Sequence, residues 1–173
     1  MIRRAELRGL AKSFVYAFRG IAYCIKNERN MRIHLSMVVL TSYLSRFYPL
    51  QRSEYLLMLL CFGLVIACEA VNTAIEALVN LGSPAYHPFA RIAKDVAAGA
   101  VLAAAIAAAA CGLFLFGRWD QLQAAFMRIF SSPLEIGLLL LLVILALLFI
   151  FNGPKLYGER TTRIYQIRNR KDS

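Results

Sequence analysis

Residues 55–81 read YLLMLLCFGLVIACEAVNTAIEALVNL, and this stretch decides the fold class. It is long enough to cross a bilayer as one helix, because about 20 apolar residues span the hydrocarbon core. Its only charged residues are Glu69 and Glu76, although a charge at membrane depth costs about 2.5–3.5 kcal/mol on insertion scales. Asn72 lies between them at a spacing that places Glu69, Asn72 and Glu76 on one face of a helix. An inward-facing stripe of acid, amide and acid suits a cation, a proton or a polar group of a substrate.

The composition of the whole chain agrees with a membrane protein. Of its 173 residues, 60% are hydrophobic and only 17% are charged, which is less charge than a soluble domain carries. Apolar runs at helical length predict an all-α membrane protein with four spans, and residues 117–133 are expected to form an outer loop between the last two. The expected spans are 31–49, 55–80, 94–116 and 134–151.

The net charge of +10 is concentrated at the two ends of the chain. Basic residues are frequent before the first expected span and after the last, and sparse between the spans. The positive-inside rule therefore predicts that both termini are cytoplasmic. Anionic lipid headgroups explain basic segments beside a membrane better than nucleic acid does, so no nucleic-acid partner is expected.

Two further segments predict how the helices are placed. Residues 5–27 carry apolar side chains at helical spacing with basic side chains on the other face, which is typical of an amphipathic helix on the membrane surface. Residues 96–112 read VAAGAVLAAAIAAAACG. Small residues four apart let helix backbones approach closely, so this third span is expected to be the central packing helix and to favour oligomerisation.

The expected topology brings one set of polar side chains to the cytoplasmic interface. These residues are Glu28, Glu69, Asn72, Glu76, Lys94 and Asp95. Carboxylate and amide oxygens are ligands that Mg²⁺ prefers, Lys94 is suited to a phosphate, and a carboxylate near lipid can act as a general base. Together these are the parts of a phosphoryl-transfer site. A purely structural alternative is that Glu76 pairs with Lys94 only to neutralise buried charge.

Two rival functions come from other classes of protein. The buried acids could serve a cation or proton channel, but the alanine-rich third span provides little polar lining for a pore. The chain could also be an inactive interaction protein, which the complete polar set disfavours. Neither GxxxxGK[ST] nor GxGxxG occurs, so the residues alone predict a site for a cation and a phosphate rather than for ATP in particular.

Three segments carry a resemblance to a known family. They are NERNMRIH (27–34), EAVNTAIEALVN (69–80) and HPFARIAKDVAAGAVL (87–102). In them the chain resembles the prokaryotic diacylglycerol kinases, a family that includes the undecaprenol kinases. The resemblance implies a homotrimer with a surface helix and three spans per subunit, and with active sites between subunits. The chain then divides into the surface helix (1–30), the three-span core (31–117), an outer loop with an additional fourth transmembrane helix (118–152), and a basic cytoplasmic tail (153–173).

The resemblance also implies the reaction and the roles of the site residues. It implies transfer of the γ-phosphoryl group of ATP, with Mg²⁺, to a lipid alcohol in a bacterial cytoplasmic membrane. Undecaprenol is favoured as the substrate, with diacylglycerol as the alternative. Glu69 is implied to be the catalytic base and Asn72 to support it, while Glu28 and Glu76 are implied to hold the metal. The implied nucleotide contacts are Tyr16, Glu28, Glu76, Tyr86, His87, Lys94 and Asp95.

The chain departs from the family pattern in two places. Asn80 stands where the family usually carries an aspartate, which could weaken a contact near the nucleotide but leaves the base and the metal pair intact. The fourth span and the basic tail are additions to the family core, and the fourth span is expected to face lipid or to act as a packing accessory.

Overall fold

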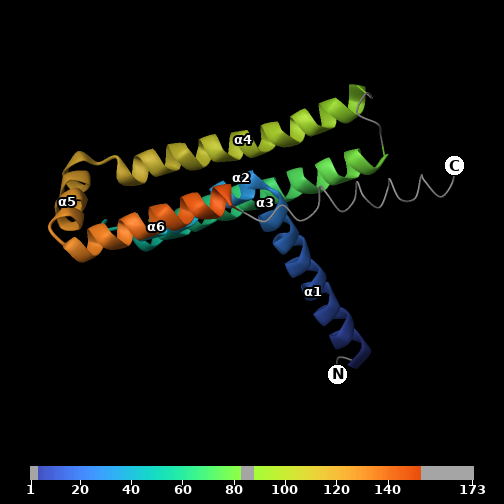
Figure 1. The fold of residues 1–173 in the computed structure, drawn as a ribbon, viewed down its shortest axis with the longest axis horizontal. Coiled ribbons are helices and arrows are strands. Elements are labelled where there is room, and N and C mark those ends of the chain that lie inside the picture. Colours follow the sequence, from blue (N-terminus) through green and yellow to red (C-terminus); the bar gives the residue numbers. More distant parts are fainter. Residues whose placement is uncertain (1–3, 83–87, 153–173) are drawn as a thin grey trace.

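The computed structural model describes residues 4–82 and 88–152, and every element in these ranges is an α-helix (Figure 1). This confirms the predicted all-α class. The helices in chain order are α1 (Arg4–Asn27), α2 (Arg29–Ser45), α3 (Arg52–Gly82), α4 (Pro88–Phe116), α5 (Trp119–Phe130) and α6 (Pro133–Phe151).

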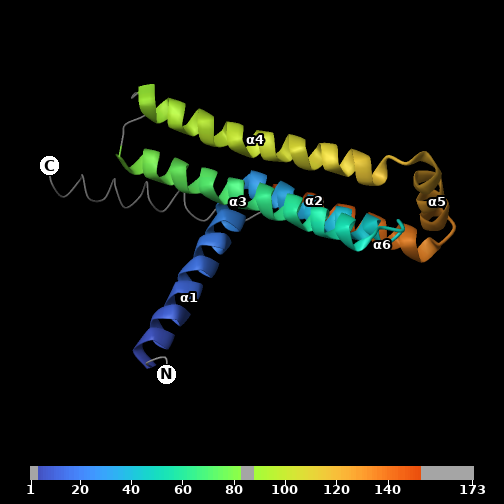
Figure 2. The ribbon, with the colours of Figure 1, turned by 180° about the vertical axis from the view of Figure 1, so that it is seen from behind.

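The helices form a long bundle with one helix leaving it. α3 and α4 run antiparallel and make the most extensive contact between elements, and α2 packs against both α3 and α6. Two opposite views show α1 leaving the bundle at a steep angle and α5 lying across the end of the bundle between α4 and α6 (Figures 1 and 2). In the same views α3 and α4 project beyond the joint between α1 and α2. The joint between α1 and α2 therefore lies beside the middle of α3 rather than beside its end.

Three of the described helices are long and apolar enough to cross a membrane, namely α3, α4 and α6. The chain is thus an integral membrane protein, and the expected spans 55–80, 94–116 and 134–151 fall on these helices. The expected span 31–49 corresponds to α2, which has 17 residues and is not one of the three. α2 carries Arg32 and ends at Ser45, and a turn follows where the sequence predicted continued helix.

The prediction of a loop over residues 117–133 is wrong, because most of this segment forms α5. Apolar residues recur along α5 at helical spacing, which was the signal for a helix. Ala125 and Ile129 from α5 are buried in a cluster with side chains from the end of α2. The cluster consists of Tyr43, Phe47, Tyr48, Ala125 and Ile129.

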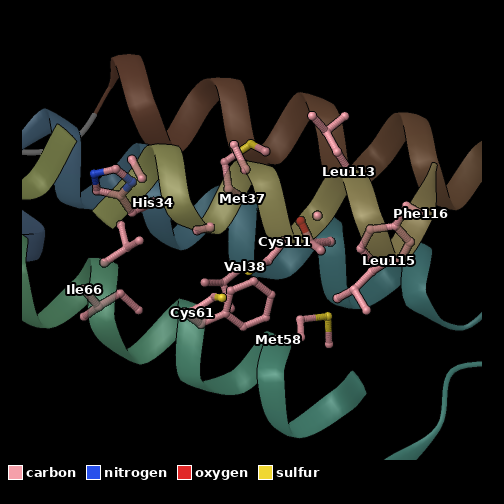
Figure 3. Close-up of a pocket in the computed structure, with 17 residues that line it drawn as sticks. His34, Met37, Val38, Met58, Cys61, Ile66, Cys111, Leu113, Leu115 and Phe116 are labelled. Atoms are coloured by element: carbon pink, nitrogen blue, oxygen red, sulfur yellow. The ribbon is translucent and has the colours of Figure 1, made fainter. Parts of the chain in front are cut away.

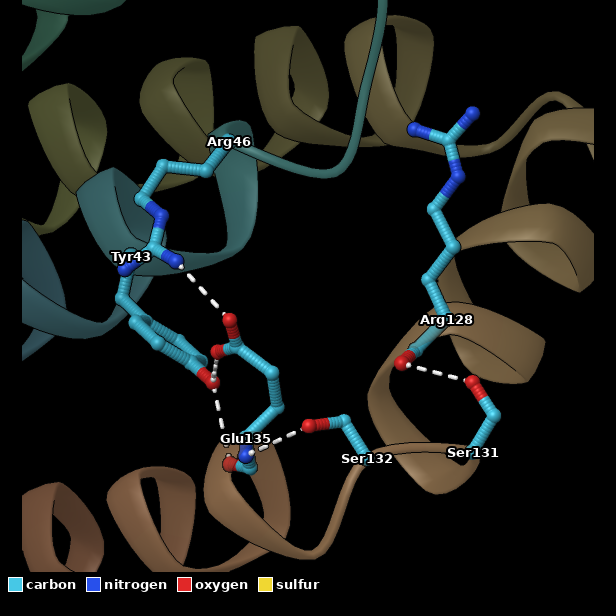
Figure 4. A network of polar contacts seen from close by, with 6 residues as sticks. All are labelled: Tyr43, Arg46, Arg128, Ser131, Ser132 and Glu135. Atoms are coloured by element: carbon cyan, nitrogen blue, oxygen red, sulfur yellow. Dashed lines mark hydrogen bonds and ion pairs between the residues drawn. The ribbon is translucent and has the colours of Figure 1, made fainter.

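α6 is joined to α2 by polar contacts at its first turn (Figure 4). The Tyr43 hydroxyl donates a hydrogen bond to the Glu135 carboxylate at 2.9 Å, and Arg46 forms an ion pair with the same carboxylate at 3.1 Å. Ser132 caps α6 by accepting a hydrogen bond from the Glu135 amide. α6 is therefore a docked part of this chain, although none of its residues is buried.

The face of α4 that packs within the chain carries Ala97, Val101 and Ala104, which are buried. The stripe that includes Gly99 and Ala103 is exposed in the single chain. The expected close packing at this stripe would therefore have to be with another subunit. The homotrimer and the surface position of α1, whose described side chains from Glu6 to Ile21 are exposed, stay predictions.

Candidate active site

Glu28 is the one residue that joins α1 to α2. Its amide donates to the Cys24 carbonyl at 2.8 Å and so closes α1, while its carbonyl accepts the Arg32 amide at 3.4 Å and so opens α2. Glu28 is the N-cap of α2 with extended backbone, yet its side chain makes no capping hydrogen bond. Its carboxylate is therefore held at a helix N-terminus, where negative charge is stabilised, and remains available to a ligand.

Glu69 is fully buried in the middle of α3, with 0% of its surface exposed. Neither of its carboxylate oxygens has a hydrogen-bond partner among the described residues, and the same is true of Oδ1 of Asn72 one turn later. Thr73 does not satisfy the Glu69 carboxylate, because its hydroxyl donates to the Glu69 backbone carbonyl at 2.9 Å. Buried polar atoms without partners are rare in folded proteins and call for an explanation. These three oxygens make the segment from Glu69 to Asn72 the candidate ligand-binding site.

The charges of Glu76 on α3 and Lys94 on α4 act on the carboxyl group of Glu28. The pKa of Glu28 is raised above its usual value, first by burial and then by the charge of Glu76, while Arg32 and Lys94 act in the opposite direction. The charges of Glu28 and Glu76 also reach Glu69. Within the described residues, no ion pair joins Glu76 to Lys94. The alternative in which Glu76 and Lys94 only neutralise each other would require this ion pair, so the described residues do not support it.

Two neighbouring cavities lie between α2, α3 and α4, and Glu69 lines the smaller of them. The smaller, of about 230 Å³, is lined by Glu69 and Asn72 together with residues of α2 and α4. The larger, of about 370 Å³, runs between α2, α3 and α4 and is lined almost entirely by apolar side chains (Figure 3). His34 and Ala105 line both cavities. The arrangement places a polar cavity at Glu69 and Asn72 next to an apolar cavity, which suits an amphiphile with a hydrocarbon chain.

The other predicted site residues lie apart from this centre in the single chain. Asp95 is exposed on α4 and forms an ion pair with Arg91 at 3.8 Å. Tyr16 is 63% exposed on α1. Tyr86 and His87 lie outside the described residues. The structure therefore brings together the set Glu28, Glu69, Asn72, Glu76 and Lys94.

Two residues near the centre were not identified as site residues from the sequence. His34 forms part of the wall between the two cavities. Arg32 is buried, with 5% of its surface exposed, beside Glu28. The signal for Arg32 was available, because a basic residue four positions after an acid at the start of an apolar helix is adjacent to it on the helix surface.

The oxygen donors fit Mg²⁺ bound together with phosphates rather than by the protein alone. Among the described residues, no group of three or more His, Cys, Asp and Glu side chains could hold a metal ion. Mg²⁺ commonly uses one or two carboxylates and completes its shell with water and substrate phosphates. Glu28 and Glu76 are close enough to influence each other's charge, and the free oxygens of Glu69 and Asn72 are nearby. The donor set is all oxygen, as Mg²⁺ requires.

Comparison with known proteins identifies one family. The family described as prokaryotic diacylglycerol kinase matches residues 15–116. An undecaprenol kinase of Bacillus subtilis (strain 168) is 37% identical over 113 residues, which cover 65% of this chain and 92% of that protein. A diacylglycerol kinase of Synechocystis sp. is 41% identical over 104 residues, covering 60% of this chain and 59% of that protein. A diacylglycerol kinase of Helicobacter pylori is 33% identical over 115 residues, covering 64% and 83%. No solved structure matches the chain.

Proposed function

The chain belongs to the prokaryotic diacylglycerol kinase family and is a membrane lipid kinase, and from this premise we propose that it transfers the γ-phosphoryl group of ATP to the hydroxyl of undecaprenol. The observation that carries the proposal is the fully buried Glu69 carboxylate, which has no hydrogen-bond partner among the described residues and lines a cavity next to an apolar one. A lipid alcohol could fill both cavities and place its hydroxyl at Glu69.

In the proposed reaction Glu69 is the general base. The lipid hydroxyl oxygen attacks the γ-phosphorus, its proton passes to the Glu69 carboxylate, and the bond from the γ-phosphorus to the bridging oxygen breaks, so that ADP leaves. A base needs to be within hydrogen-bond reach of the proton that it takes, and the unpaired Glu69 oxygens are available for this. Asn72, one turn along α3 from Glu69, supports the site beside the base. Lys94 attracts the phosphate oxygens as a point charge.

Glu28 and Glu76 are the proposed metal ligands. Mg²⁺, when bound with ATP, would offset charge on the phosphate oxygens. Burial, and after it the charge of Glu76, raise the pKa of Glu28. A divalent cation held by these two carboxylates would offset this charge, so the pair is suited to binding metal together with nucleotide.

Undecaprenol is proposed over diacylglycerol on two grounds. The relative with the largest fraction of its own length covered is named undecaprenol kinase. The apolar cavity next to the one at Glu69 has a volume of about 370 Å³, which suits one hydrocarbon chain better than two. The alternative substrate is diacylglycerol, which the names of the other two relatives favour.

We further propose a homotrimer in a bacterial cytoplasmic membrane with both chain termini on the cytoplasmic side. The basic ends of the chain support this orientation. The exposed positions of Tyr16 and Asp95 support a site completed by a neighbouring subunit, because both are free to meet another chain.

The purified full chain tests the proposal in a competition assay. Undecaprenol and diacylglycerol are offered together with ATP and Mg²⁺ in mixed micelles, and the phosphorylated lipids are separated. We expect undecaprenyl phosphate to dominate. Preferential formation of phosphatidic acid would show that diacylglycerol is the substrate and would leave the kinase assignment in place. If neither lipid were phosphorylated, the proposed reaction would be contradicted.

A further inference from the structure

The Arg32 side chain links the C-terminal ends of two helices. Its Nη1 donates to the carbonyls of Ile25 at 3.3 Å and Lys26 at 3.2 Å in the last turn of α1. Its Nε and Nη2 both donate to the Ile150 carbonyl, each at 3.4 Å, in the last turn of α6. A buried guanidinium thus connects the joint that carries Glu28 to a helix beyond the family match, which ends at residue 116.

These carbonyls are groups that a helix cannot satisfy by itself. The last carbonyls of any α-helix lack intrahelical partners. For Ile150, the residue that would donate to it if the helix continued is Pro154, which has no amide hydrogen. A guanidinium has five donors in a fixed fork, so it can serve several carbonyls at once.

The same contacts offset the charge of Arg32. Within the described residues, Arg32 has no carboxylate in ion-pair contact, and a buried charge needs compensation. Each helix C-terminus carries roughly half a negative charge, so the ends of α1 and α6 together offset about one positive charge. α6 therefore contributes to this compensation together with the end of α1 and the nearby charge of Glu28.

We propose that Arg32 is a positioning residue for the nucleotide-binding part of the site and that α6 assists it. Together they hold the α1–α2 joint in place, and the joint determines the position of the Glu28 carboxylate. The functional half of this inference rests on the proposed kinase reaction. Its structural half concerns only the rigidity of the joint and can be tested without substrate.

A matched pair of substitutions at Phe151 isolates the contribution of α6 in the full chain. Phe151→Pro forces the preceding residue out of the helical region and so turns the Ile150 carbonyl away from Arg32. Phe151→Ala removes only the ring, over which Arg29 is stacked at 5.0 Å, and keeps the carbonyl in place. Arg32→Met removes all the donors, and Arg32→Lys retains the charge but not the fork.

The first measurement is amide hydrogen exchange at Glu28, whose amide donates to Cys24. We expect exchange about tenfold faster in Arg32→Met, as suits the loss of charged hydrogen bonds. Phe151→Pro should be intermediate, while Phe151→Ala should match the wild type. The double variant Arg32→Met/Phe151→Pro should exchange no faster than Arg32→Met alone. Equal exchange in Phe151→Pro and Phe151→Ala would overturn the role of α6.

The second measurement is the affinity for ATP with Mg²⁺, taken from KM and from equilibrium binding. Displacing Glu28 should raise KM about tenfold in Arg32→Met with kcat changed less than about twofold, because binding rather than the base is affected, and Arg32→Lys should recover part of the loss. Faster exchange with unchanged nucleotide affinity would overturn the positioning role. A wild type without kinase activity would refute the proposed function alone, since exchange at Glu28 would still test the joint.

Discussion

Asn72 lies one turn after Glu69 on α3, and the buried side-chain oxygens of both have no hydrogen-bond partner in residues 4–82 and 88–152. A fold that only needed to span the membrane would place apolar side chains at both positions, because unsatisfied buried polar groups destabilise a protein. The cost is tolerated at the smaller cavity, which Glu69 and Asn72 both line. This relationship predicts opposite effects on stability and on activity.

Glu69→Gln should reduce kcat at least about 100-fold, the usual contribution of a general base. The KM for ATP should stay near the wild-type value, since the metal and phosphate contacts are retained. The melting temperature should be at least that of the wild type, because a neutral amide is less costly to bury without partners than a carboxylate. Steady-state kinetics and thermal unfolding in one detergent check both. Glu54→Gln, in the first turn of the same helix, is the control. Turnover at the wild-type rate in Glu69→Gln would remove Glu69 from the mechanism.

Glu28→Gln and Glu76→Gln should each raise the Mg²⁺ concentration required for half-maximal activity. Each proposed ligand supplies an oxygen to a cation that is also held by the phosphates of ATP, so the apparent affinity for ATP should fall in parallel. Titrations of Mg²⁺ at fixed ATP, followed by titrations of ATP at saturating Mg²⁺, separate the two effects. If a variant has the same Mg²⁺ titration curve as the wild type, the substituted glutamate is not a metal ligand.

The raised pKa of Glu28, caused first by burial and then by Glu76, predicts a pH dependence of stability. The folded protein retains the Glu28 proton at a pH where the unfolded chain has lost it. The resulting stabilisation is complete below the unfolded pKa and is lost as the pH rises through the folded pKa. Without Mg²⁺, acidification from neutral pH should therefore raise the melting temperature of the wild type relative to Glu28→Gln. A constant difference between the two proteins across that range would contradict this prediction.

Gly99→Leu should weaken self-association and leave the fold of the single chain intact. A Cβ atom added at Gly99 has no neighbouring atom within 4 Å outside its own helical backbone, so the substitution reports mainly on contacts with other subunits. Gly137→Leu on α6 is a matched control, because that glycine is equally free of neighbours. Crosslinking in mild detergent measures the oligomer. Equal crosslinking of both variants and the wild type would show that the Gly99 face of α4 contacts lipid.

Trp119 reports where α5 lies, because it is the single tryptophan of the chain. It begins the helix that connects α4 to α6, and its side chain is exposed. Tryptophan favours the membrane–water interface, so lipids brominated near the headgroup should quench its fluorescence more than lipids brominated deep in the acyl chain. The Trp119→Phe variant provides the background. Stronger quenching by the deep label would place α5 within the hydrocarbon core.

Much of the fold and part of the site could be predicted from local pattern. The length of the apolar runs predicted α3, α4 and α6, since a bilayer sets the length of a spanning helix. Helical periodicity predicted that Glu69, Asn72 and Glu76 share a face, since offsets along one helix do not depend on the rest of the protein. The amphipathic pattern of residues 119–130 was equally local, and α5 could have been predicted from it.

The tertiary structure decided how separate helices meet. The Arg32 side chain and the Ile150 carbonyl are 118 positions apart, and their contact depends on α6 docking along α2. Likewise, the Glu28 carboxylate comes within electrostatic reach of Glu76 and Lys94 because the joint between α1 and α2 lies beside α3. Local sequence specifies which helix ends leave carbonyls without partners, whereas the packing of helices decides which side chain satisfies them.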